Sequence, residues 1–202
     1  MLVPLFAARH PMFSASGYRN ALQFYRFLLR QSRCGRITPE WIIDLAACEL
    51  AVAVVSQGEG AEDFPPVDWS RATVVSVRRS PHALFLVSGH DVRSLLGGGG
   101  EGQAVERRTV PLAVVPEHGP GTTRILELEP SVFSWVRSLR SWQMLAADDV
   151  ARDDIRELLG TLTSAGLVRL RVEPAVAGCV QEQAGEPARP ATFSPTRLTM
   201  SP

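Results

Sequence analysis

The spacing of apolar residues predicts helices near both ends of the chain. Apolar side chains recur every three or four positions over Gly17–Arg30, which predicts an amphipathic helix. The following segment, Trp41–Val55, is apolar on nearly all sides, as in a helix that is buried on most of its faces. The same period returns over Pro130–Leu139 and Asp153–Ala165, and Gly166 is suited to end the last helix.

Five short apolar or β-branched runs between and after these helices predict strands. The first two, Thr73–Arg78 and Ala83–Val87, are separated by a few turn residues and read as a hairpin. Turn-forming residues also join Thr109–Val115 to Thr122–Leu128, and Leu167–Val172 closes the pattern after the last helix.

The order of these elements predicts an α+β fold in which a helical unit precedes a small antiparallel sheet and winged-helix-like helices. A segment rich in glycine, proline and acidic residues begins at Gln57 and predicts a boundary. We therefore expect a helical unit at 1–60, a strand-rich domain at 69–172, and a flexible proline-rich tail at 173–202.

Charge argues against the DNA binding that a winged-helix-like ending usually suggests. The 202-residue chain has a formal net charge of zero, with 21 basic and 21 acidic residues, and every basic residue is arginine. From Pro130 to Val172 there are six arginines and five acidic residues, whereas a groove-reading domain carries a clear basic excess. We expect no nucleic-acid partner, and a peptide or protein ligand instead.

Neither a membrane anchor nor a catalytic centre is indicated. The longest apolar run is shorter than the roughly 20 residues that span a bilayer, and no signal-peptide pattern is present, so we expect a soluble, cytoplasmic protein without a membrane partner. Three cysteines form no Cys-x-x-Cys pair, and four histidines lack metal-binding spacing and read as surface or turn residues. We expect Cys34 and Cys48 to be core or helix-edge residues. The sequence therefore predicts no catalytic residue and no metal ligand in this chain.

The strands followed by helices, with Ala-Gly-Leu-Val at 165–168, resemble the PqqD-like winged-helix modules that recognise precursors of ribosomally made peptide natural products. The resemblance implies that a leader peptide adds as an extra strand and packs against the third helix. By position, the receiving strand is Arg124, Ile125, Leu126, Glu127 and Leu128, and the helix contributes Asp153, Arg156, Glu157 and Gly160.

The N-terminal half resembles the helical domain of partner proteins of multinuclear non-haem iron oxidases, which modify cysteine in precursor peptides of the methanobactin and 3-thiaglutamate type. The resemblance rests on Tyr18-Arg19-Asn20 at the start of one helix and on the Trp41–Ala51 string in the next. It implies a non-catalytic subunit that forms a heterodimer with an iron-dependent oxidase and presents a precursor peptide to it. The iron would belong to the oxidase, and this chain would hold no cofactor. The docking residues would be Tyr18, Arg19, Tyr25 and Trp142.

An alternative function stays open at this point. A winged-helix transcription regulator with an N-terminal effector unit would show the same order of elements and would bind DNA with a steep dependence on salt. The three acidic residues near the start of the last helix, Asp153, Asp154 and Glu157, count against it.

Overall fold

A computed structural model shows an α+β protein and describes residues 17–58, 69, 72–96, 105–117 and 121–174. The helices are α2 (Gly17–Arg33), α3 (Ile42–Ser56), α4 (Pro130–Ser138), α5 (Ala147–Ala151) and α6 (Asp153–Ser164), with a short 3-10 turn at Arg93–Leu95. The strands are β1 (Ala72–Arg79), β2 (Leu84–Ser88), β3 (Val110–Pro116), β4 (Thr123–Glu127), β5 (Gln143–Met144) and β6 (Val168–Pro174). The four helices expected from the apolar period are confirmed to within a few residues.

The strands form two separate antiparallel sheets, one in the order β2-β3-β4 and one in the order β5-β1-β6. The predicted hairpin between the first two strands is therefore wrong. Strand β1 pairs with β6 and β5, whereas β2 pairs with β3. After β1 the chain leaves the β5-β1-β6 sheet at Ser80, whose amide still donates to the carbonyl of Leu167. It then enters the β2-β3-β4 sheet.

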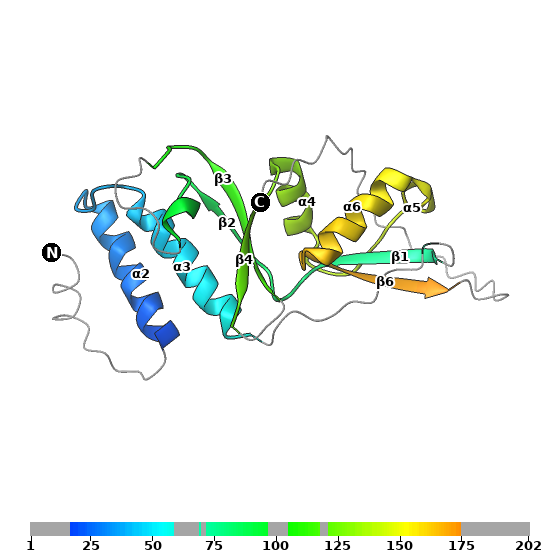
Figure 1. Cartoon of the computed structure of the whole chain (residues 1–202), viewed down its shortest axis with the longest axis horizontal. Coiled ribbons are helices and arrows are strands. Elements are labelled where there is room, and N and C mark those ends of the chain that lie inside the picture. Colours follow the sequence, from blue (N-terminus) through cyan, green and yellow to red (C-terminus); the bar gives the residue numbers. More distant parts are fainter. Residues whose placement is uncertain (1–16, 59–68, 70–71, 97–104, 118–120, 175–202) are drawn as a thin grey trace.

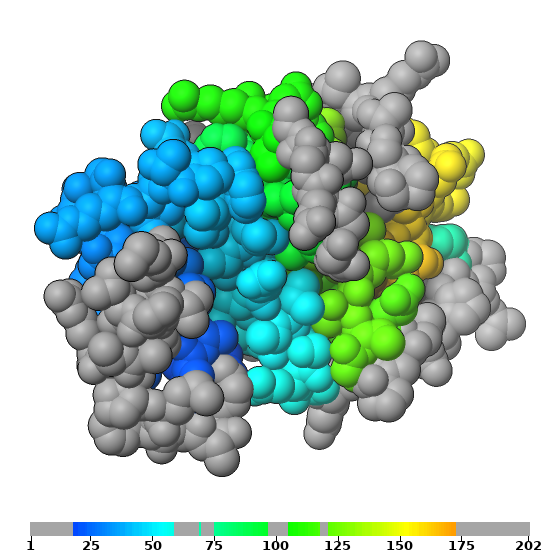
Figure 2. All heavy atoms as spheres, turned by 60° about the vertical axis from the view of Figure 1, so that its left-hand side comes forward, coloured from blue at the N-terminus to red at the C-terminus, as the bar shows by residue number. Residues whose placement is uncertain are grey.

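The β2-β3-β4 sheet is the middle layer of the molecule (Figure 1). On one face, Ala51 and Val55 of α3 pack with Val114, Leu86 and Ile125. On the other face lie α4, α6 and, beyond them, the β5-β1-β6 sheet. The predicted helical unit at 1–60 is thus in direct contact with strands of the predicted domain at 69–172, and Figure 2 shows the end of α3 against the chain around β4.

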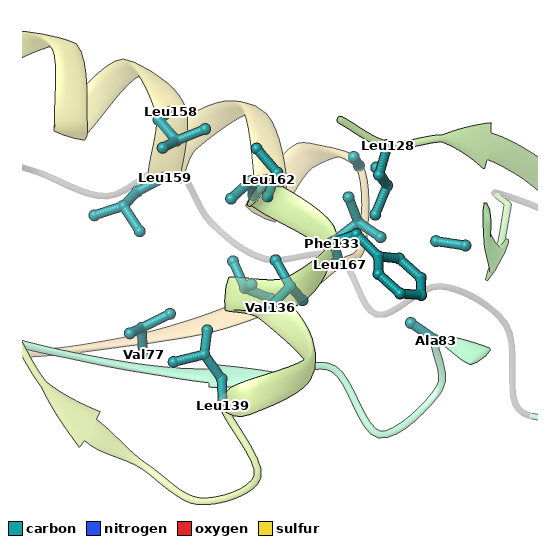
Figure 3. Packing of buried hydrophobic residues seen from close by; sticks show 14 of the residues in the cluster. Val77, Ala83, Leu128, Phe133, Val136, Leu139, Leu158, Leu159, Leu162 and Leu167 are labelled. Carbon is teal, nitrogen blue, oxygen red and sulfur yellow. The ribbon is translucent and has the colours of Figure 1, made fainter. Parts of the chain in front are cut away.

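The largest core joins the two sheets through α4 and α6 (Figure 3). Leu158, Leu159 and Leu162 of α6 meet Val136 of α4 there, because a period of three to four residues places them on one side of the helix. Helix α6 is followed by Gly166, which has a φ of +74°, as expected for the residue after a helix C-cap.

Helix α4 begins where its sequence provides a cap. The carboxylate of Glu129 accepts hydrogen bonds from the amides of Ser131 and Val132, and Pro130 occupies the first turn, where no amide donor is needed. This cap fixes the point at which the chain turns from β4 into the core helix.

Among the described residues, no helix has the length and apolar character needed to cross a bilayer. The tail predicted at 173–202 lies outside the described residues from residue 175 onwards.

Candidate functional site

Strand β4 is an edge strand, as required of a strand that accepts a peptide. Within the described residues it pairs only with β3. The amide of Leu128 donates to the carbonyl of Pro111, and the amide of Glu117 donates to the carbonyl of Thr122. Because hydrogen-bonded pairs alternate along an antiparallel ladder, the backbone groups of Arg124 and Leu126 also point to β3. Those of Thr123, Ile125 and Glu127 point to the open side.

The side chains of β4 are divided between the two faces of the middle sheet. Ile125 packs toward α3, while Leu126 and Leu128 pack into the core on the side of α4. Arg124 shares the side of Leu126 and is exposed. Leu128 is only 2% exposed, so of the five predicted receiving residues it is the one that serves the core rather than a ligand.

Glu127 belongs to a cluster of four charges at one end of β4. Its carboxylate lies 2.5 Å from Nη1 of Arg108 and 2.7 Å from Nη2 of Arg93. The same two arginines contact the carboxylate of Asp91, at 2.5 Å from Arg108 and 2.8 Å from Arg93. The Glu127 side chain is thus held by two cations of its own chain, and its role in peptide binding stays a prediction.

The electrostatics of this cluster favour its charged state. Hydrogen bonds from Arg93 and Arg108 hold the pKa of Asp91 well below its usual range, and the hydrogen bond from Arg108 lowers the pKa of Glu127. In the sequence, Arg108 lies 19 residues from Glu127 and 17 residues from Asp91. Such a cluster is created by the fold, so no spacing in the sequence indicates it.

The predicted helical half of the peptide site does not lie beside β4. Asp153, Arg156 and Glu157 occupy the first turns of α6, next to α5, and Gly160 follows one turn later. Between this part of α6 and β4 stands α4, with Phe133 and Val136 in the shared core (Figure 3). Helix α3, rather than α6, packs along β4. A single groove between β4 and the start of α6 is therefore not formed.

The four predicted docking residues also fall on two distant surfaces. Tyr18, Arg19 and Tyr25 lie on α2, at one end of the molecule, whereas Trp142 stacks on Arg78 of β1 at the other (Figure 1). Tyr25 is half-buried, and burial together with the nearby carboxylate of Asp44 raises its pKa. Arg19 is the exposed member of the α2 group.

His90 and Asp44 form a pair that the sequence does not indicate. His90 Nδ1 lies 2.7 Å from a carboxylate oxygen of Asp44, and the same oxygen accepts from the amide of Gly89 at 3.2 Å. The His90 side chain is 14% exposed and lies in the bend that follows β2, so of the two expected placements, surface or turn, it fits the turn. The pair ties α3 to the end of β2.

Cys48 lies one helical turn after Asp44 but is not suited to act as a nucleophile. It is fully buried among Val92, Val110 and Leu112, as expected for a core cysteine. Burial, and then the carboxylates of Asp44, Glu49 and Asp91, raise the pKa of the thiol to about 11. At neutral pH only about one thiol in ten thousand is therefore ionised, and the thiolate is the reactive form.

Thiol labelling checks this placement. In a Cys179→Ser background, we expect dithionitrobenzoate to modify Cys34, which is exposed, within minutes, and Cys48 only when the protein unfolds. A Cys48→Ser variant should leave the fast phase unchanged. Fast labelling of two thiols in the folded protein would show that Cys48 is accessible.

In the part of the chain that the structure describes, no three histidine, cysteine or acidic side chains come together as metal ligands could. No protein-family model, curated protein or solved structure matches the chain.

Proposed function

We propose that this protein is a non-catalytic accessory subunit that binds the leader of a ribosomally made precursor peptide and presents the cysteine-containing core to an iron-dependent oxidase. The observation that carries the proposal is the open edge of β4, where the backbone groups of Thr123, Ile125 and Glu127 face away from the sheet. An extended peptide can add to such an edge through main-chain hydrogen bonds.

The surroundings of β4 define which side chains a bound leader peptide would contact. On one face the added strand would meet Ile125 beside α3, and on the other it would meet the exposed Arg124 and the half-buried Leu126. Tethering the leader in this way raises the effective concentration of the core at the partner's active site, without any new contact to the core. The exposed side of α2, which carries Arg19, is the proposed docking surface for the oxidase.

DNA binding through α6 is the alternative, and the described residues do not favour it. The outward side of the first turns of α6 carries Asp153, Asp154 and Glu157, all exposed. These carboxylates would face the phosphates of a bound duplex. A gel shift with genomic fragments at low salt tests this alternative, and a salt-sensitive shift would support it.

Proline at the open edge provides the direct test of peptide binding. Thr123→Pro removes an amide donor that points away from β3, so the internal ladder stays intact. We expect calorimetry with a precursor peptide encoded beside the gene, in the absence of metal, to show binding that this change weakens at least about tenfold, because both a hydrogen bond and the close approach of the added strand are lost.

The matched control is Thr123→Val, which keeps the amide donor and should bind like the unmodified protein. Arg124→Pro, in contrast, removes a donor to β3 and should lower the melting temperature. Equal binding by the Thr123→Pro and Thr123→Val variants would exclude β4 as the receiving strand.

A further inference from the structure

Four exposed arginines of α2 lie along one side of the helix, and we call them the arginine row: Arg19, Arg26, Arg30 and Arg33. At 3.6 residues per turn, the four positions fall within a sector of about 60° around the helix axis and extend for about 21 Å along it. Helix α2 packs on α3 and is the outermost of the described elements at its end of the molecule (Figure 1). The arginine row is therefore on the surface, facing away from the core.

No acidic group within the described residues balances the arginine row. Helix α2 contains no aspartate or glutamate. None of the ion pairs between described residues includes an arginine of the row. Arg93 and Arg108, in contrast, are each held by carboxylates of this chain. The guanidinium groups of the row are thus placed to bind carboxylates of another molecule.

The electrostatics of α2 itself do not account for the whole row. Arg30 and Arg33 lie in the last turn, where the helix dipole favours cations. Arg19 lies in the first turn, where the dipole disfavours them. Arg26 and Arg30 are four residues apart, a spacing at which like charges on a helix destabilise it. A partner that supplies negative charge would remove these unfavourable interactions.

The spacing of the arginines indicates the form of that partner. Arg19, Arg26 and Arg33 follow one another at seven residues, or about 10.5 Å along the helix axis. Leu22 and Leu29 have the same seven-residue spacing, are partly exposed, and lie beside the row. A second helix can match this repeat, because packed helix pairs bury an apolar seam and pair charges at its flanks. An extended peptide does not match it, since its side chains recur on one face every 6.6 to 6.8 Å, roughly.

Two other anionic partners fit the surroundings of the row less well. A helix that enters a membrane surface uses large apolar side chains, but Phe27 and Leu28 are 3% and 1% exposed and pack with Ile37 in the core. Single-stranded nucleic acid stacks its bases on exposed rings, whereas the aromatic side chains of α2 are all buried or partly buried.

We propose that the arginine row docks an acidic amphipathic helix of another protein, one that repeats carboxylates and an apolar side chain every seven residues. Leu22 and Leu29 would contact the apolar side chains, and the arginines would bind the carboxylates through charge-assisted hydrogen bonds. The proposal rests on the proposed function in that the oxidase is the partner expected at α2, and it adds the chemistry of the element that docks there.

Fluorescence anisotropy with a labelled model helix tests this proposal without the oxidase or a precursor peptide. The probe is an alanine-rich peptide of about 21 residues, long enough to match the row and to form a helix, with one leucine and two glutamates of each heptad on one side. One comparison peptide has glutamine in place of glutamate, and another has the same composition with the glutamates spread around the helix. We expect the one-sided glutamate peptide to bind more tightly than both, with an affinity that falls as salt is added.

The Arg26→Gln/Arg30→Gln variant should bind the one-sided glutamate peptide roughly tenfold more weakly, as expected for the loss of two exposed ion pairs. Both side chains are exposed and glutamine is a good helix former, so the melting temperature should be unchanged. The matched control is Arg107→Gln/Arg140→Gln, which removes two exposed arginines outside α2 and should bind like the unmodified protein.

Thr123→Pro should also bind the model helix normally, which separates this surface from the β4 edge. Calorimetry with the precursor peptide therefore tests leader binding, and the model helix tests the docking surface, so either can fail alone. Equal binding of the glutamate and glutamine peptides, or of the Arg26→Gln/Arg30→Gln variant and its control, would overturn the proposal. Binding to vesicles of phosphatidylserine and phosphatidylcholine, without binding of the model helix, would overturn it in favour of a lipid surface.

Discussion

Replacing Leu162 with alanine should lower the free energy of unfolding by about 3 to 5 kcal/mol, the range seen when a fully buried leucine is truncated and its cavity persists. Leu162 is 0% exposed and packs where α6, α4 and the middle sheet meet (Figure 3). Because its neighbours come from several elements, the surrounding structure has little freedom to close the cavity. Urea unfolding followed by circular dichroism measures the change as a lower midpoint.

The matched control lies on the same helix. Ser164 is exposed at the end of α6, so Ser164→Ala should change the free energy of unfolding by less than about 0.5 kcal/mol. A loss below about 1 kcal/mol for Leu162→Ala would mean that α6 does not pack with this face toward the core.

Replacing Arg108 with methionine should destabilise the protein by about 1 to 2 kcal/mol at neutral pH, and by less in acid. Arg108 bridges Asp91 and Glu127, and in its absence the two carboxylates share Arg93 alone. This loss of stability is smaller than for a buried ion pair, because the Arg108 side chain is 34% exposed and solvent screens the interaction.

The dependence on pH follows from the lowered pKa values of Asp91 and Glu127. A carboxyl whose pKa is depressed by folding contributes stability that is complete above its unfolded pKa, here 3.8 and 4.5, and is lost as the pH falls toward the folded value. The variant lacks most of this contribution. The difference between the two proteins should therefore be largest above about pH 5 and should shrink as the pH falls below 4.

Arg107 provides the control for this experiment, since it is the exposed neighbour of Arg108. Arg107→Met should change stability by less than about 0.5 kcal/mol at every pH. If the Arg108→Met and Arg107→Met variants had the same stability at neutral pH, the four-charge cluster would contribute nothing to the fold.

The helices could be predicted because their signals are local. Apolar residues at helical spacing in α6, the acidic first turn and Gly166 all belong to one short segment. The same holds for β3 and β4, whose connection is rich in turn residues and whose strands do pair.

The pairing of β1 could not be predicted, because its partners are distant in sequence. The residues around Pro81 look like a hairpin turn, yet β1 pairs with β6, almost a hundred residues later, and with β5, which has only two residues. The same limitation applies to the candidate sites. The sequence indicated β4 as a candidate peptide-binding strand. It could not indicate the partners of Glu127, the Asp44–His90 pair or the pairing of Arg78 with Arg169, because these exist only after folding.

The position of β1 also has a consequence for synthesis of the chain. Helices α2 and α3 and the β2-β3-β4 sheet can assemble as soon as residues up to about Glu127 have left the ribosome, since the strand pairing of this sheet and its contacts with α3 are available by then. Strand β1 cannot pair with β6 until β6 has been synthesised. Until then the apolar side chains of β1, Val75 and Val77, are uncovered. During this interval the nascent protein carries an unpaired strand, so a chaperone that covers β1 would act on a half-made chain rather than on the finished one.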